Sequence, residues 1–412
     1  MMTPDTQAAI AKLRQPQTIR DRCQQLFELG QAGKLEHFAC DLTQLDAVAD
    51  YVVATTQQLY PDFDVPFHSR WRHFDAGGVP RLAQLEAHLA GLSTQAAARS
   101  RLDLAIVSVL LDAGAGSQWR YYDTDANQVL GRSEGLAIAS LHAFQRGVFS
   151  SVPKQPYQVD AAGLQALTEK DLATVFQVSG DNPLVGLSGR LTLLHQLGQT
   201  LVAQPQRFGA NGLRPGNLLD YWQYTHGSEL DAGQLLTDVL ESFSTIWPGR
   251  VAIADTNLGD VWPHPALPQT RPGSNLVPFH KLSQWLTYSL VEPLESAGLT
   301  VTHLNALTGL AEYRNGGLCV DLGLLVPQHA AVTHEAHLPG SPVVVEWRAL
   351  TVIMLDLIGD RVRQRLHKTP TELPLIKVLE GGTWAAGRRI AKHLRPETGA
   401  PPITIQSDGT VF

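Results

Sequence analysis

The sequence predicts a mainly α fold, built as one large helical domain with a small β element near the C-terminus. Apolar residues recur at three- and four-residue spacing along most of the 412 residues, and this is the period of one helix face. Strand-like alternation is confined to the last residues of the chain. No internal repeat and no change in composition divides the sequence into parts, so a single unit is expected.

Four helices are predicted in the first three quarters of the chain, each with an apolar face or a nearly apolar sequence. They cover Leu82 to Leu92, Leu102 to Asp112, Leu191 to Leu201 and Phe279 to Glu292. The glycines at 114 and 116 are expected to end the second helix, because glycine releases the backbone from helical geometry. Pro293 is expected to end or kink the fourth, because proline lacks an amide donor.

The last long helix carries a start signal. Ser341 can cap it with a hydroxyl, and Pro342 fits the first turn, so the helix is expected to run to about Leu366. The segment from Pro402 to Phe412 alternates and contains Asp408-Gly409, which suggests a terminal hairpin. Residues 1–80 are interpreted as a helical lead-in that packs on a catalytic core of residues 81–412.

Composition bounds the class of protein. Hydrophobic residues make up 44 % and charged residues 17 %, as in globular proteins. The formal net charge of -7 argues against nucleic acid as a partner. The three cysteines show no paired motif, and the sequence shows neither a signal peptide nor an apolar run that could cross a bilayer. We therefore expect a cytoplasmic protein with no membrane partner, whose oligomeric state the sequence leaves open.

Islands of polar residues interrupt the apolar sequence, and such islands are often sites because burying polar groups without purpose is costly. The island from Phe67 to Asp75 contains Arg72 and could clamp an anion, or serve as a strut between domains. The island from Gly116 to Asp123 contains Arg120 and could bind an anion, or simply cap a helix. A third, at 179–190, has no P-loop or nucleophile elbow and is expected to cap a helix.

Two further islands contain carboxylates. Asp260 stands beside Trp262 and could be a catalytic acid whose pKa is raised by desolvation, or an ordinary turn aspartate. Glu312 and Arg314 are two positions apart and so do not share a helix face, but a turn could direct both into one cavity; a solvated loop is the alternative. No metal is expected, because the run from His334 to His337 lacks the ligand spacing of a helix-borne zinc site.

These last two islands belong to strings that resemble the uracil-catabolism family of fungi and bacteria. The matching strings are Phe67–Phe74, Trp119–Asp123, Ile246–Pro248, Leu258–Pro263, Val277–Leu290 and Leu307–Gly317. A fainter similarity links Phe279–Leu286 and Leu310–Arg314 to the F-Y-K-R-A-Q-I-L and F-A-D-Y-R strings of the queuosine-salvage nucleoside hydrolases. Phe208–Asn211 is similar to their F-G-G-S-F-x-N loop.

The resemblance implies a helical core like that of DNA glycosylases and hydrolysis of an N-glycosidic bond. The implied substrate is a small molecule, a ribosyl ureide or pyrimidine-derived nucleotide; ribosylurea or its phosphate would give urea and ribose or its phosphate. Cleavage has an oxocarbenium-like transition state, which a carboxylate stabilises. Glu312 and Asp260 are the implied catalytic residues, although Glu312 stands where the nucleoside hydrolases have aspartate.

The same resemblance implies a set of substrate-binding residues. Phosphate would be held by Arg314, Lys281, Arg72 and Arg120, while Tyr313, Trp262, Asn211 and His280 would contact the rest of the substrate. The hydrolysis needs no cofactor. Two alternatives stay open: a ureide amidohydrolase that releases ammonia, and a non-catalytic protein that binds a nucleotide or sugar phosphate.

Overall fold

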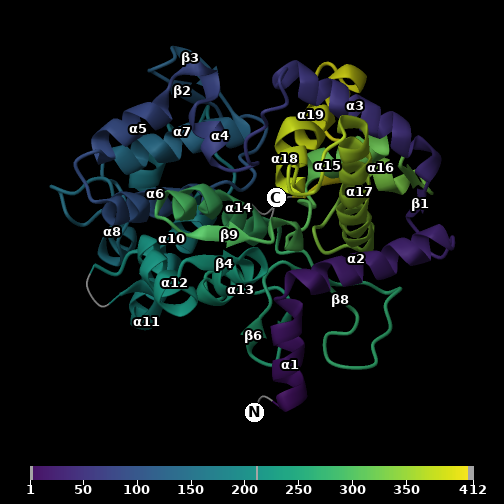
Figure 1. Ribbon diagram of the computed structural model, residues 1–412, viewed down its shortest axis with the longest axis horizontal. Coiled ribbons are helices and arrows are strands. Elements are labelled where there is room, and N and C mark those ends of the chain that lie inside the picture. The colour runs from purple at the N-terminus through teal and green to yellow at the C-terminus, as the bar shows by residue number, and fades with distance from the viewer. Residues whose placement is uncertain (1–2, 210–211, 407–412) are drawn as a thin grey trace. The chain divides into compact units, whose positions relative to one another are not determined.

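The computed structural model describes residues 3–209 and 212–406, and it confirms the mainly α class (Figure 1). The described residues form two compact units that alternate along the sequence. The first unit contains the chain up to His68, Gly249–Gln284 and the described residues from His303 onward. The second contains Ser69–Pro248 and Trp285–Thr302. The boundary expected at residue 80 stays a prediction.

Helices of the first unit gather around one buried helix, α17. Its neighbours by direct contact are α2, α3, α15 and α18 (Figure 1). The helices of this unit are α1 (Pro4–Leu13), α2 (Pro16–Gln31), α3 (Leu45–Leu59), α15 (Tyr313–Asp321), α16 (Ala331–His334), α17 (Pro342–Leu366), α18 (Leu375–Val378) and α19 (Trp384–Leu394). Two short 3-10 helices of this unit are η1 (Leu42–Gln44) and η4 (Leu304–Ala306), and η5 (Leu379–Thr383) is a π-helix.

The expected start of α17 is confirmed. Ser341 Oγ accepts a hydrogen bond from Val344 N at 3.5 Å, and Pro342 occupies the first turn. Every residue from Val343 to Leu355 is buried, including Glu346 and Arg348. A helix that is buried all round needs partners for such charged side chains, and Arg348 finds one in Asp260.

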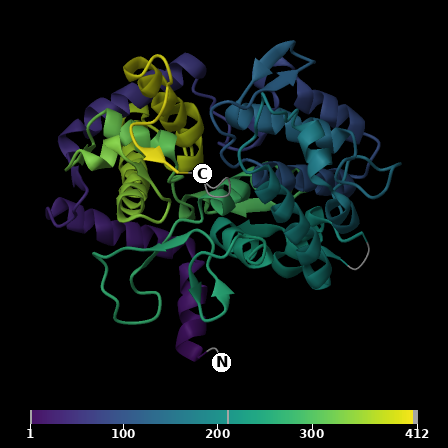
Figure 2. The same ribbon diagram turned by 180° about the vertical axis from the view of Figure 1, so that it is seen from behind.

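Strands in the first unit occur as two-stranded pairs. They are β1 (Phe38–Cys40) with β10 (Leu325–Pro327), β5 (Ala252–Ile253) with β6 (Thr256–Asn257), β7 (Val261–Pro263) with β8 (Leu276–Pro278), and β11 (Ala336–His337) with β12 (Thr404–Ile405). The predicted C-terminal β element is present as β12, the yellow arrow in Figure 2. It pairs in parallel with β11, and the expected hairpin beyond it falls on residues 407–412, outside the described chain.

The second unit is also helical. It comprises α4 (Trp71–Phe74), η2 (Ala76–Gly78), α5 (Arg81–Leu89), α6 (Thr94–Leu110), α7 (Arg132–Gln145), α8 (Ala161–Ala166), α9 (Glu169–Val175), α10 (Leu187–Ala203), α11 (Pro205–Phe208), η3 (Pro215–Asn217), α12 (Leu218–His226) and α13 (Ala232–Ser242). Two strand pairs complete it: β2 (Tyr121–Asp123) with β3 (Gln128–Leu130), and β4 (Glu229–Asp231) with β9 (Thr300–Thr302). The helices α5, α6 and α10 confirm three of the helices that were predicted from the spacing of apolar residues.

Helix α14 (Lys281–Ser296) begins in the first unit and continues in the second. It corresponds to the helix predicted at 279–292, and of the two outcomes expected for Pro293, an end or a kink, the structure excludes the end. Proline at this position leaves the carbonyl of Ser289, four residues earlier, without its helical donor. The indole nitrogen of Trp71 donates to that carbonyl at 2.8 Å, so the helix can continue for one more turn. No described helix is both long and apolar enough to cross a membrane.

Candidate active site

Asp260 and Arg348 form the centre of the candidate site in the first unit. Asp260 follows Gly259, just before β7, and Arg348 lies in the buried middle of α17. The guanidinium donates to both carboxylate oxygens, from Nη1 to Oδ1 at 2.8 Å and from Nη2 to Oδ2 at 2.7 Å. The backbone N–H of Lys281 adds a third bond at 3.0 Å, and the indole of Trp262 adds a fourth at 2.7 Å. The carboxylate is therefore held on all sides by donors.

This environment sets the ionisation of Asp260. Burial alone would raise its pKa, but the Arg348 charge and the hydrogen bonds from Arg348, Lys281 and Trp262 together hold the pKa well below its usual range. The expectation that desolvation raises this pKa was wrong, because the sequence does not show the guanidinium that faces the carboxylate. Asp260 is a stable anion here and is poorly suited to donate a proton.

Glu312 is the N-cap of α15. Its carboxylate accepts hydrogen bonds from Asn315 N at 2.6 Å and Arg314 N at 2.8 Å, the usual role of an acidic side chain at a helix start. The residue is only 8 % exposed, so the alternative of a solvated loop does not describe it. Burial raises the pKa of Glu312, while the Lys281 ammonium and the two backbone N–H groups act in the opposite direction.

Lys281 is the first residue of α14. The residue before it, His280, has a left-handed backbone with φ of 47°, which is uncommon for a residue with a side chain. This turn starts the helix directly beside Asp260, whose main-chain carbonyl accepts from Phe279 N at 2.9 Å and His280 N at 3.3 Å. The Lys281 ammonium acts on Glu312 through space; neither side chain has an ion pair shorter than 4.0 Å within the described ranges.

Close packing fixes the start of α15. The indole nitrogen of Trp347 donates to Gly316 O at 3.0 Å, and a Cβ added at Gly316 would lie 2.7–2.8 Å from the Trp347 ring. On another side, a Cβ added at Gly387 of α19 would lie 2.2 Å from Arg314 O. Glycine is thus required at both contacts. The Asn315 side chain further braces the turn by donating from Nδ2 to Leu310 O at 3.1 Å.

The other predicted site residues of the first unit have partners as well. Arg314 donates from Nη1 to Gly399 O at 2.7 Å, and its guanidinium lies over the Tyr313 ring at 5.2 Å. His280 is buried, and its Nε2 lies 2.9 Å from Leu13 O. Trp262 is covered by Gly340, where a Cβ would come within 2.4 Å of the indole. The structure therefore groups Asp260, Trp262, His280, Lys281, Glu312, Tyr313 and Arg314 in one unit.

Three predicted binding residues are not in that group. Arg72 lies in the second unit and pairs with Glu292 at 2.6 Å. Arg120 also lies there, and its Nη1 donates to the carbonyls of Ser117 at 2.8 Å and Trp119 at 2.7 Å. Asn211 falls outside the described residues. The predicted phosphate-binding role of Arg72 and Arg120 stays a prediction.

Arg348 is the residue that the sequence interpretation missed. The prediction for its helix rested on the apolar residues of the inner face, and Arg348 was not considered. A charged side chain in the middle of a helix that is otherwise apolar is a signal that could have found it, since such a charge must be paired when buried.

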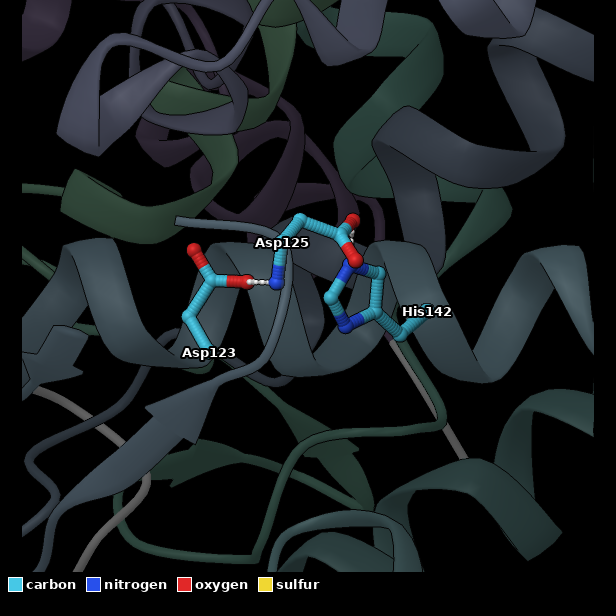
Figure 3. Close-up of side chains that lie close together, drawn as sticks. All are labelled: Asp123, Asp125 and His142. Atoms are coloured by element: carbon cyan, nitrogen blue, oxygen red, sulfur yellow. Dashed lines mark hydrogen bonds and ion pairs between the residues drawn. The ribbon is translucent and has the colours of Figure 1, made fainter. Parts of the chain in front are cut away.

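A second polar cluster lies in the second unit, where Asp123, Asp125 and His142 come close together (Figure 3). One ligand atom from each lies within 4.8 Å of the others, which suits a metal ion. However, the buried guanidinium of Arg81 pairs with Asp123, and its Nε lies 4.0 Å from Asp125 Oδ2. Because Arg81 already supplies positive charge, ion pairing accounts for the cluster without a metal.

Together, the fold and the site define a mainly α protein with a buried glutamate and a lysine at the starts of two helices, joined through one aspartate–arginine pair. The chain belongs to the family described as "Protein of unknown function (DUF1688)", whose model matches residues 12–412. It is 42 % identical over 415 residues to Protein urg3 of Schizosaccharomyces pombe, covering 98 % of this chain and 99 % of that protein. It is 36 % identical over 430 residues to Uracil catabolism protein 4 of Lachancea kluyveri, covering 96 % and 97 %. These matches confirm the predicted membership of the uracil-catabolism family.

Proposed function

We propose that the protein acts in uracil catabolism, as the name of its Lachancea kluyveri relative suggests, and that it hydrolyses the N-glycosidic bond of ribosylurea or ribosylurea phosphate. Water adds to the anomeric carbon, the carbon–nitrogen bond breaks, and a proton reaches the departing nitrogen. The products are urea and ribose or ribose phosphate.

The observation that carries this proposal is the state of Glu312. Its carboxylate is buried, oriented by two backbone N–H groups, and has a raised pKa. A general base works best when its pKa lies close to the operating pH, and a carboxylate held in place can also stabilise a neighbouring oxocarbenium ion. Glu312 is therefore the proposed catalytic carboxylate, and it would either activate water or stabilise the sugar cation.

Lys281 and Asp260 have supporting roles in the proposal. The Lys281 ammonium lies near Glu312 and can interact with a phosphate or with the carbonyl oxygen of the leaving urea. Asp260 is saturated by donors and stays ionised, so it is assigned to holding the site together rather than to proton transfer. Of the two carboxylates predicted from the sequence to be catalytic, Glu312 alone keeps that role in the proposal.

The test is to incubate the purified protein with ribosylurea and, separately, with ribosylurea phosphate, and to measure urea and ammonia in the same samples. We expect urea without ammonia, and about a thousand-fold loss of the rate in Glu312→Gln, in line with the contribution of a positioned acid or base. Glu335→Gln, at an exposed position of the same unit, is the matched control and should keep wild-type activity.

The two alternatives predict different products. Release of ammonia with the ribosyl carbon–nitrogen bond intact would identify an amidohydrolase and remove the proposal. Binding of either compound with no product, in wild type and variants alike, would identify a binding protein. Equal urea release by wild type and Glu312→Gln would exclude Glu312 as the catalytic group.

A further inference from the structure

The guanidinium of Arg348 is bonded to two separate segments of the candidate site. On one side, Nη1 and Nη2 bind the Asp260 carboxylate at 2.8 and 2.7 Å. On the other side, Nε donates to the carbonyl of Ala311 at 3.1 Å. Ala311 directly precedes Glu312, so one planar group contacts both the Asp260 loop and the turn that carries the proposed catalytic carboxylate.

Asp260 extends this connection to Lys281. Its Oδ2 accepts a hydrogen bond from the backbone N–H of Lys281 at 3.0 Å. Its main-chain carbonyl accepts hydrogen bonds from the N–H groups of Phe279 and His280, the two residues before Lys281. These bonds place the first turn of α14. The chain of contacts therefore runs from Lys281 through Asp260 and Arg348 to the residue before Glu312.

The environment of Arg348 makes this connection rigid. Its side chain is only 2 % exposed, that of Asp260 is 14 % exposed, and the guanidinium lies 4.1 Å from the centre of the Phe279 ring. Arginine presents its donors in a fixed plane, whereas lysine has one flexible ammonium. No lysine could bind both carboxylate oxygens and the Ala311 carbonyl with the same geometry.

We propose that Arg348 is a positioning residue that fixes the separation between the Lys281 ammonium and the Glu312 carboxylate. It acts through Asp260 on the first group and through the Ala311 carbonyl on the second. The consequence for catalysis rests on the proposed hydrolytic function, whereas the mechanical coupling of the two helix starts does not.

Amide hydrogen exchange tests the coupling without reference to activity. In Arg348→Lys, the ammonium can still pair with Asp260 but loses the Ala311 carbonyl, so exchange should accelerate at residues 310–316 while the Lys281 amide changes little. In Asp260→Asn, the Arg348 pair is weakened as well, so exchange should accelerate at both the Lys281 amide and residues 310–316. Arg363→Lys is the matched control, since Arg363 lies on the same helix and also donates to a main-chain carbonyl, that of Leu373; it should leave both segments unchanged.

Kinetics then separate positioning from general stability. Misplacement of reacting groups by about 1 Å costs on the order of 100-fold in rate, so Arg348→Lys should lower kcat about 100-fold with a change in KM below about threefold. Unchanged exchange at residues 310–316 in both variants would overturn the proposal. If Arg348→Lys does not fold, Asp260→Asn decides alone. The coupling then requires acceleration at 310–316, a segment to which no hydrogen bond of Asp260 runs among the described residues, beyond the acceleration at the other helices of the same unit. Acceleration that is no larger at 310–316 than at those helices would overturn it. Absence of urea release by the wild type would instead refute the proposed function and leave the exchange result to decide the coupling.

Discussion

The guanidinium of Arg348 and the carboxylate of Asp260 meet through two parallel hydrogen bonds of 2.8 and 2.7 Å, although 88 positions separate them in the sequence. Paired in this way, each residue satisfies a charge that burial would otherwise penalise. The pair also orders the loop before β7 against the buried middle of α17. Its loss should therefore be visible in stability as well as in activity.

Asp260→Asn should lower the free energy of unfolding at pH 7 by about 3 kcal/mol, because removing one partner leaves a buried charge uncompensated. The pKa of folded Asp260 lies below 3.8, the ordinary value for an aspartate, so the stabilisation is present above that pH and is lost as the pH falls through the folded pKa. Denaturant unfolding at a series of pH values measures both effects.

The control for this prediction is an ion pair on the surface. Asp50 pairs with Arg365 and its side chain is 65 % exposed, so Asp50→Asn should change the free energy of unfolding by less than about 1 kcal/mol. Equal losses of unfolding free energy in Asp50→Asn and Asp260→Asn would show that the buried Asp260–Arg348 pair stabilises the fold no more than a surface ion pair does.

The pH dependence of turnover should report Glu312. Its pKa is raised above 4.5 by burial, and under the proposed function the ionised form is the active one, so kcat/KM should rise with pH through a value above 4.5. Lys281→Met removes the nearby ammonium that lowers this pKa, so the rise should move to higher pH. Lys34→Met, at an exposed position of the same unit, should leave the profile in place, and a profile unmoved in Lys281→Met would contradict the prediction.

The packing of α15 against α17 gives a prediction about Gly316. A Cβ there would lie 2.7–2.8 Å from the Trp347 ring, so Gly316→Ala should reduce stability by about 1–3 kcal/mol through overpacking. Gly91, where a Cβ would meet nothing within 4 Å, provides the comparison, and Gly91→Ala should cause no loss. Thermal unfolding of both variants measures the difference; a Gly316→Ala protein as stable as wild type would mean that α17 can move away.

His280 should contribute to loss of stability in acid. Burial lowers its pKa from 6.5, so the neutral ring is favoured in the folded protein, where Nε2 lies 2.9 Å from Leu13 O. The stabilisation is present above about pH 6.5 and is lost as the pH falls through the lowered pKa. Asparagine tolerates a left-handed backbone and does not titrate.

Wild type should therefore lose stability more steeply than His280→Asn as the pH falls below 6.5, as measured by the midpoint of urea unfolding. His393→Asn, at an exposed position, should follow the wild-type curve. Parallel curves for wild type and His280→Asn would assign the acid sensitivity to other groups.

Local patterns predicted much of the fold. The apolar faces of α5, α6 and α10 and the Ser341–Pro342 start of α17 are visible in the sequence, because each depends on neighbours within a few positions. The sequence left open whether Pro293 ends or kinks α14, since the continuation of the helix depends on a hydrogen bond from Trp71, a residue more than 200 positions earlier. The alternation of the two units likewise depends on long-range contacts such as those of α2 and α3 with α17.

The candidate site was predicted unevenly for a similar reason. The polar islands indicated Glu312 and Asp260, because polar residues within apolar sequence are noticeable one by one, whereas Lys281 was indicated only by the family resemblance. Their ionisation was not predictable, since the sign of the pKa shift of Asp260 is decided by Arg348 and that of Glu312 by burial. Choosing a candidate residue thus required only the sequence, whereas assigning its state of ionisation required knowledge of its neighbours in three dimensions.

The interruption of the first unit by the second has a consequence during synthesis on the ribosome. The apolar faces of α2 and α3 pack on α17, which begins only at Pro342. At a translation rate of about 5–20 residues per second, roughly 15–60 s pass between the emergence of α3 and that of α17. Over that interval the apolar faces of α2 and α3 are exposed on the nascent chain without their native partner. Holdase chaperones bind newly made proteins under this condition.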